Sequence, residues 1–235
     1  MTRMFCCLAL VIAGLFSGSD SYGQLLFSET FDDATGFTTS TAFFSDGGSD
    51  FFGLAGGVDD YGADLVPTGV SPYTGFSGGF LTGEDLDGEG AGLPITVEFL
   101  NINIAGQTNL VFSGDFAEFF DDPGDIDATE QLFVEAQIDG GGFAPILTFT
   151  PGNFTSGTSN GFFELGAATL GNAAQTFAAP ISGTGSTLDL RLVVSLNAGD
   201  EDFAVDNFTV TAIPEPGSMV LLGMASLGMV FRRRR

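Results

Sequence analysis

The chain has 235 residues, of which 44% are hydrophobic, with 26 Phe, 35 Gly and a formal net charge of -24. This length predicts one domain of ordinary size, and a Phe- and Gly-rich composition without Trp favours many short strands over a helical bundle. The charge argues against a nucleic-acid partner, because such binding depends on Lys and Arg that neutralise phosphates.

The charge is concentrated between Gln24 and Ile213. That stretch holds 28 of the 30 acidic residues, since only Asp20 and Glu215 lie outside it. Its single basic residue is Arg191, so its formal net charge is -27. Carboxylates in such number indicate divalent cations, salt or a basic partner as counter-charges, or they simply keep an extracellular protein soluble.

Residues 1–23 have the three parts of a secretory signal peptide. Arg3 supplies the positive charge, residues 4–16 form an apolar stretch, and Ser21 and Gly23 are the small residues that precede a cleavage site. We expect a signal helix that is removed before Gln24. The cysteines of the chain lie in this segment, so the mature protein is predicted to contain neither thiol nor disulfide.

The middle of the chain, residues 24–213, shows the period-two alternation of β-strands and no helical period of useful length. A hairpin is predicted where two apolar runs flank Asp139-Gly140-Gly141-Gly142. The pattern predicts an all-β fold, an antiparallel β-sandwich, with loops at residues 45–65 and 82–93. The strands are expected at residues 25–31, 110–116, 132–138, 143–149, 188–196 and 204–210.

Both ends of this region resemble the ends of jelly-roll domains, which include galactose-binding-like domains and carbohydrate-binding modules. The resemblance lies in residues 27–32, with the sequence FSETFD, and in residues 202–208, with the sequence DFAVDNF. It implies that the first and last strands are neighbours and share a structural calcium site. It also implies an alternative function, that of a calcium-dependent carbohydrate-binding module that recognises polysaccharide.

Two carboxylates stand out because alternation places them among apolar residues. Glu29 falls on the strand face of Phe27, and Asp206 falls on the face of Phe208 and Val210. A buried carboxylate is costly without a partner, and Ca²⁺ accepts six to eight oxygen ligands. We therefore expect a structural Ca²⁺ site that uses these two side chains. If the strands instead lie at an exposed edge, the acids are solvated and bind no metal.

The proposed calcium ligands are Glu29, Asp32, Asp202 and Asp206, with Asp33 nearby. Two denser acidic segments, residues 121–130 and 84–89, are interpreted as solvated turns. The first lacks the glycine and glutamate spacing of an EF-hand loop.

Catalysis has little support in the sequence. The chain has no His, so it cannot form a Ser-His-Asp or Cys-His arrangement, and the expected mature chain has neither Lys nor Cys. A carboxylate-dependent glycoside hydrolase is a further alternative, since paired acids can hydrolyse glycosides. We expect a protein that is not an enzyme.

The C-terminal residues 214–235 have a distinctive order. Pro214-Glu215-Pro216 precedes an uncharged apolar segment, residues 217–231, and then Arg232, Arg233, Arg234 and Arg235. The apolar segment predicts a short transmembrane helix, and the arginines are expected on the cytoplasmic side, which leaves residues 24–213 outside. One interpretation of this order is an ordinary membrane anchor that happens to come after a Pro-Glu-Pro sequence.

The tail also resembles the PEP-CTERM sorting domain. The resemblance implies recognition by exosortase, a membrane-embedded cysteine transpeptidase, and removal of the tail near Pro214-Glu215-Pro216. The sequence thus predicts an exported protein of the cell surface or extracellular matrix, associated with biofilm or exopolysaccharide and anchored in the membrane before processing.

Overall fold

The computed structural model describes residues 23–46, 50–56, 73–118, 126–152, 162–199 and 201–213. Regular structure in these residues is β-strand, apart from one short 3₁₀ turn, η1, at Gly88–Gly90. None of the helical structure among them is long and apolar enough to cross a bilayer. The expected signal helix and the expected C-terminal transmembrane helix fall outside the described residues.

Fourteen strands are present in the described residues. They are β1 Gln24–Glu29, β2 Thr38–Thr39, β3 Phe44–Ser45, β4 Phe51–Ala55, β5 Phe80–Glu84, β6 Ile95–Asn103, β7 Leu110–Ala117, β8 Gln131–Ile138, β9 Ala144–Pro151, β10 Phe163–Leu165, β11 Ala168–Thr169, β12 Gln175–Ile181, β13 Thr187–Ser195 and β14 Asp202–Ala212.

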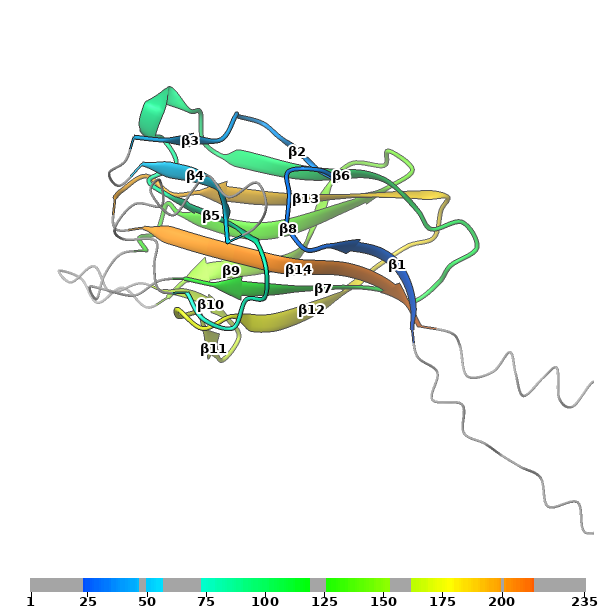
Figure 1. Cartoon of the computed structure of the whole chain (residues 1–235). Helices are drawn as coiled ribbons and strands as arrows, with labels where there is room; N and C mark the ends of the chain where they lie inside the picture. Colours follow the sequence, from blue (N-terminus) through cyan, green and yellow to red (C-terminus); the bar gives the residue numbers. More distant parts are fainter. Residues whose placement is uncertain are drawn as a thin grey trace, which may run out of the picture.

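The strands form two antiparallel sheets that pack face to face (Figure 1). Sheet A has the order β12-β7-β14-β5-β4-β3, with β1 also paired to β14, and sheet B has the order β11-β10-β9-β8-β13-β6-β2. The central strands therefore run β5-β14-β7-β12 in one sheet and β6-β13-β8-β9 in the other, which is the strand order of a jelly roll. The predicted antiparallel sandwich and its hairpin, β8–β9, are confirmed.

The last strand lies in the middle of sheet A. β14 pairs with β7 along most of its length, with β5 through residues 202–205 and with β1 through residues 208–212. The first and last strands are thus neighbours, as the jelly-roll resemblance implied. Gln24 pairs with Ala212, so β1 begins where β14 ends (Figure 1).

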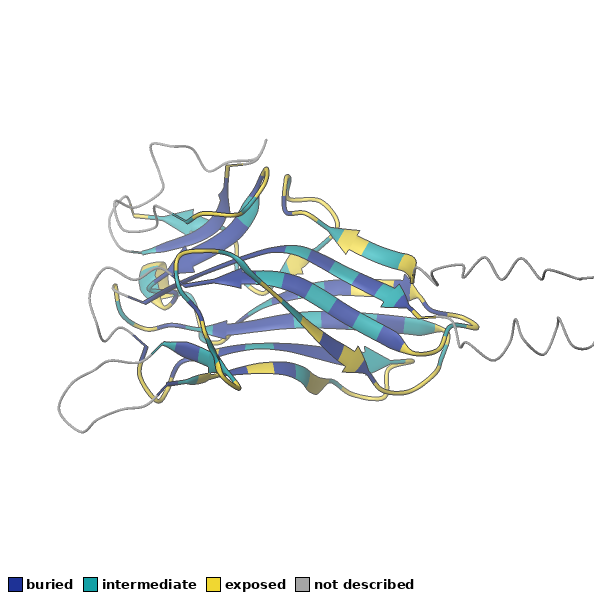
Figure 2. Cartoon of the chain, turned by 90° about the horizontal axis from the view of Figure 1, so that it is seen from below, coloured by how far each residue is buried: buried dark blue, intermediate teal, exposed yellow. Residues whose placement is uncertain are grey.

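A phenylalanine cluster fills the space between the sheets. Phe208 on β14 is fully buried and contacts the ring of Phe112 in an edge-on arrangement, with the centroids 5.1 Å apart. The rings of Phe31, Phe99 and Phe116 also surround it. In Figure 2, buried positions recur along the strands of both sheets, as expected when each sheet turns one face to a shared core.

Two predicted loops contain strands. The region 45–65 includes β4, and the region 82–93 includes most of β5. All five residues of β4 are buried, as are four of the five in β5, so both faces of these strands are covered. A strand that is covered on both faces shows no period-two alternation, and the glycines and acids around it then suggest a loop.

Candidate functional site

A β-bulge in β14 decides which way Asp206 points. The register with β7 shifts between Asp206 and Thr209, where Asn207 has a φ of +52°. The core residues of β14 are consequently Phe203 and Val205 before the bulge, and Phe208, Val210 and Ala212 after it. The predicted alternation that placed Asp206 on the face of Phe208 is therefore wrong, because the extra residue moves Asp206 to the outer face.

Glu29 lies on the other side of the sheet. It pairs directly with Phe208, and directly opposed residues of an antiparallel pair share a face, so Glu29 is on the core side, as the sequence predicted. One of its carboxylate oxygens accepts a hydrogen bond from the Phe31 N–H at 2.8 Å. Partial burial raises the pKa of Glu29. Glu29 and Asp206 are thus not brought to one side of sheet A.

The other three sequence-predicted ligands, Asp32, Asp202 and Asp206, accept hydrogen bonds from the strap, which we define as residues 73–79. The Gly79 N–H donates to Asp32 Oδ1 at 2.7 Å, and the Tyr73 hydroxyl donates to Asp202. The Ser77 N–H donates to Asp206. The strap is also tied to residues 172–174 through Thr74, whose N–H donates to the Asn172 carbonyl at 2.8 Å. These three acids therefore help to hold the strap against the protein.

Asp206 is fully buried on this outer face. Burial raises its pKa to about 7, and the nearby charges of Asp115 and Asp32 act in the same direction. Its oxygens also accept hydrogen bonds from the Asn207 N–H at 2.7 Å and the Asn207 amide at 3.1 Å. These hydrogen bonds compensate in part for the loss of hydration.

Most of the other buried acids gather at the end of the sandwich where β5, β7 and β13 finish and where β8 and β14 begin. We call this the carboxylate end. Its described acids include Asp50, Glu84, Asp85, Asp87, Glu118, Asp127, Glu130, Glu201 and Asp202. Five of them, Glu84, Glu118, Glu130, Glu201 and Asp202, are buried.

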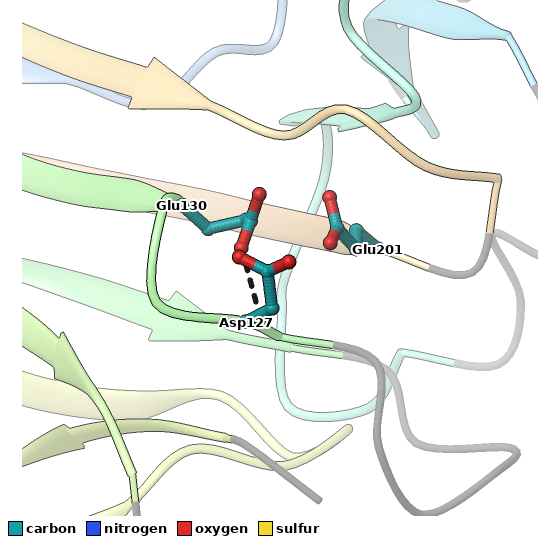
Figure 3. Close-up of side chains that lie close together, drawn as sticks. All are labelled: Asp127, Glu130 and Glu201. Atoms are coloured by element: carbon teal, nitrogen blue, oxygen red, sulfur yellow. Dashed lines mark hydrogen bonds between the residues drawn. The ribbon is translucent and has the colours of Figure 1, made fainter. Parts of the chain in front are cut away.

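Three carboxylates at this end converge. Asp127 and Glu130 lie on the segment that leads into β8, and Glu201 directly precedes β14, as Figure 3 shows. One carboxylate oxygen from each lies within 4.8 Å of the others. Glu130 and Glu201 are 3% and 2% exposed, so two of the three acids are almost completely removed from bulk water.

Local hydrogen bonds position this group. The Asp127 N–H donates to Glu130 Oε2 at 2.9 Å, drawn as the dashed line in Figure 3. The Asn197 side-chain amide donates to Glu130 Oε1 at 2.6 Å, and the Asn197 N–H donates to Glu201 Oε2 at 2.7 Å. Asn197 therefore connects two acids that are 71 residues apart in the sequence.

The electrostatics of the three acids differ. Burial raises the pKa of Glu130 to about 7, and its hydrogen bond with Asp127 adds to that effect. Burial raises the pKa of Glu201 to about 8. The pKa of Asp127 is lowered by its hydrogen bond with the Glu130 carboxyl group. Asp127 therefore loses its proton at lower pH than the other two, whereas the pKa values of Glu130 and Glu201 lie at or above neutral pH.

No basic side chain compensates this group among the described residues. The one basic residue there, Arg191, lies on the outer face of sheet B, where its Nε donates to Glu135 Oε2 at 2.9 Å and its guanidinium stacks 4.1 Å from the ring centre of Phe143. A hard divalent cation such as Ca²⁺ fits three converging carboxylates, because oxygen is its preferred ligand. Asp127, Glu130 and Glu201 are the residues that could hold it.

The local sequence around Asp127 and Glu130 predicted a solvated turn, and nothing around Glu201 singled it out. The burial of Glu130 and of Glu84 contradicts the solvated interpretation at these two positions. The residues next to Glu201 in the sequence do not indicate that it is buried or lies near other acids of the cluster, because it lies among acids at the end of the short connection between β13 and β14. Only the packing of the segment before β8 against the β13–β14 connection brings these acids together.

A shallow groove of about 400 Å³ lies at the opposite end. It is lined by the β8–β9 hairpin and the end of β12, including Ile138, Pro145, Ile146, Pro180 and Ile181. Its lining contains no aromatic residue, whereas sugar-binding sites commonly use aromatic rings as stacking surfaces. It also contains no ionisable side chain.

The segment after β14 gives the clearest comparison with known proteins. Residues 212–235 match the family model described as the PEP-CTERM protein-sorting motif. The chain carries a PEP-CTERM sorting tail. The first two residues of the match, Ala212 and Ile213, belong to the folded domain, since β14 ends at Ala212. No curated protein matches the chain.

Three solved structures illustrate the partial similarity of the sandwich. The CBM22-1 xylan-binding domain of Xyn10C from Paenibacillus barcinonensis is 11% identical, with a TM-score of 0.41, over 83% of this chain and 98% of that one. The K3 cleaved adhesin domain of Lys-gingipain from Porphyromonas gingivalis is 13% identical, with a TM-score of 0.45, over 80% of this chain and 99% of that one. The CBM35 domain from Paenibacillus barcinonensis is 15% identical, with a TM-score of 0.36, over 79% of this chain and 98% of that one. The fold assignment rests on the strand order of the two sheets.

Proposed function

We propose that residues 24–213 form a non-catalytic domain that is exported and sorted by exosortase, through the PEP-CTERM tail, to the cell surface or extracellular matrix. The observation that carries this proposal is the match of residues 212–235 to the sorting motif, directly after the last strand of the sandwich. In this role the domain is a structural or adhesive component of a biofilm or exopolysaccharide layer. Its high negative charge favours solubility and association with cations outside the cell.

Intact-mass spectrometry of the protein from its host tests this proposal. We expect a chain that begins at Gln24 and lacks the residues after Pro214-Glu215-Pro216. A Glu215→Ala variant should accumulate with its tail, whereas the control Glu89→Ala, which changes an exposed acid far from the tail, should be processed like the wild type. A wild-type protein that retains Arg235 in a host that makes exosortase would contradict the proposal.

A calcium-dependent carbohydrate-binding module is the second candidate function. The cluster of Asp127, Glu130 and Glu201 supports its calcium component, because it combines buried carboxylates with the lack of a basic partner among the described residues. The carbohydrate component would involve polysaccharide on a polar face, such as the outer face of sheet B around Arg191 and Phe143. A glycan array tests it, and no binding across neutral and acidic polysaccharides would count against a module of this kind.

The non-catalytic assignment can be tested on the same samples. A glycoside hydrolase would release reducing sugar from a polysaccharide, and Glu201→Gln or Asp127→Asn would abolish that release. We expect no release by the wild-type protein. Turnover that both substitutions remove would establish an enzyme and overturn the assignment.

A further inference from the structure

The end of the sandwich opposite the carboxylate end has a different chemistry. We call it the tail end, and it consists of residues 23–25 and 213 with the connections 104–109, 139–143 and 182–186. Strand register brings these segments together: Gln24 pairs with Ala212, and Ala212 pairs with Leu110. The connections 104–109 and 182–186 join the two sheets at this end, where the Ile104 N–H donates to the Ser186 carbonyl at 3.0 Å.

The chain is fixed to the sandwich up to the residue before the Pro-Glu-Pro sequence. The Ile213 N–H donates to the Asn109 carbonyl at 3.1 Å, and the Asn109 side-chain amide donates to the Ile213 carbonyl at 3.3 Å. The uncharged apolar segment begins at Gly217, four residues later, a span of at most about 14 Å when fully extended. The tail therefore has no long linker that would let the domain move away from a membrane that holds this segment.

The tail end carries little charge and exposes apolar side chains. Its segments contain one ionisable residue, Asp139, whose carboxylate accepts hydrogen bonds from the Ser186 and Thr187 N–H groups at 2.9 Å. Leu25 is 57% exposed and Ile213 is 45% exposed, two of the three most exposed large hydrophobic residues in the described part of the chain. Residues 24–213 have a net charge of -27, and the acids among the described residues thus lie mainly along the faces and at the carboxylate end.

We propose that the tail end rests on the outer surface of the membrane while the PEP-CTERM tail is uncleaved, with the carboxylate end pointing away from the lipid. This inference rests on the proposed function, because it needs the tail in a membrane. Leu25 and Ile213 contact the lipid headgroup region, where exposed apolar side chains are stabilised. The orientation also keeps most carboxylates beyond one Debye length of about 8 Å from anionic headgroups.

A second copy of the chain fits this surface less well. Two domains joined through their tail ends would direct their tails toward each other from opposite sides, because β14 ends at this surface in both copies. Such a pair could not place both tails in one membrane from the same side. The lipid surface is thus the occupant that agrees with the position of the tail.

The test uses the tail-bearing chain after signal removal, residues 24–235, in phosphatidylcholine vesicles. This chain has no Cys, so a single dye can be attached at Gln107→Cys in the tail end or at Glu89→Cys near the carboxylate end. A quencher attached to lipid headgroups should quench the dye at residue 107 several-fold more strongly than the dye at residue 89. Equal quenching of the two dyes would overturn the proposal.

Charge variants provide a second readout. Leu25→Glu and Ala105→Glu should each reduce headgroup quenching of the residue-107 dye, while Leu100→Glu, which alters an exposed leucine on β6, should leave it unchanged. Unchanged quenching in both tail-end variants, with intact circular dichroism, would contradict the proposal. So would protection of the dye from aqueous iodide without headgroup quenching, which would indicate a second copy. Processing in the host is measured separately, so failure of sorting and failure of this orientation remain distinguishable.

Discussion

Asp206 and Asp115 lie directly opposite each other on the neighbouring strands β14 and β7, on the outer face of sheet A. Asp115 also accepts hydrogen bonds from the Thr176 hydroxyl and from the Asn207 side-chain amide, the latter at 2.9 Å. Asp206 is the fully buried member of the pair. The burial of Asp206 couples the stability of the domain to pH, because the folded state favours the proton on Asp206.

The first prediction concerns this pH dependence. The pKa of Asp206 is raised in the folded state to about 7, so its contribution to stability is present at low pH and is lost as the pH rises through that value. The midpoint of urea unfolding should therefore fall between about pH 6 and pH 8, and Asp206→Asn should flatten that change. If the urea midpoint of Asp206→Asn changes with pH as much as that of the wild type, Asp206 is excluded as a source of the pH dependence of stability.

Asp139→Asn provides the matched control. The pKa of Asp139 is lowered by hydrogen bonds from the Thr187 and Ser186 N–H groups, so its contribution is present above its unfolded pKa and is lost as the pH falls. This variant should be less stable than the wild type at about pH 6 and at about pH 8 by a similar amount. Between these two pH values, the stability of this variant should change with pH as steeply as that of the wild type.

The second prediction concerns calcium. Ca²⁺ should raise the melting temperature, and the gain should be larger at about pH 8.5 than at about pH 6, because ligands must lose their protons before they bind metal. The raised pKa values of Glu130, about 7, and Glu201, about 8, set this direction. Differential scanning fluorimetry with Ca²⁺ and with EDTA measures it.

Variants distinguish the two possible calcium sites. Loss of the calcium effect in Glu130→Gln and Glu201→Gln would assign it to the carboxylate end, whereas loss in Glu29→Ala and Asp206→Ala would assign it to the ligands predicted from sequence. An unchanged melting curve with Ca²⁺ in the wild type, at both pH values, would exclude a structural calcium site.

The third prediction concerns the attachment of the strap. Gly78 has a φ of +89°. A Cβ at this position would overlap with the carboxylate of Asp32, which accepts a hydrogen bond from the Gly79 N–H. Gly106 also has a positive φ, +74°, but its surroundings are open. Gly106→Ala should cost about 1 kcal/mol in the free energy of unfolding, from backbone strain alone.

Gly78→Ala should cost more than Gly106→Ala, because it adds the displacement of Asp32 to the same backbone strain. Proteolysis within the strap should also become faster in the Gly78 variant and not in the Gly106 variant. Equal losses of stability in the two variants, measured by urea unfolding, would show that Asp32 does not restrain the strap.

The fourth prediction concerns the phenylalanine core. Phe208→Ala should cost about 3–5 kcal/mol, since it leaves a cavity among four other rings. Phe76→Ala, on a strap ring that is only partly buried, should cost less. Gly114→Ala should also destabilise, because its Cβ would lie 2.6 Å from the Phe208 ring. Thermal unfolding of the three variants checks this ranking.

Several features could be predicted from the sequence. Local alternation predicted β7, β8 and β13, because each of these strands turns one face to the core and one face outward. The glycine-rich turn between two apolar runs predicted β9 as the second strand of a hairpin. The sorting tail was also readable, since its motif, apolar segment and arginines are contiguous. Such signals depend on neighbouring residues along the chain, so they need no knowledge of packing.

Other features depend on the packing of distant segments. The bulge at Asn207 places Asp206 on the outer face of sheet A instead of the core face. The sequence of β4 does not alternate between apolar and polar residues, because both faces of this strand are covered. The Asp127–Glu130–Glu201 cluster exists because two connections distant in sequence pack at the same end of the sandwich. Strand character, charge and the sorting tail are local properties of the chain, whereas non-local pairing decides which carboxylates lose their water and which lie together.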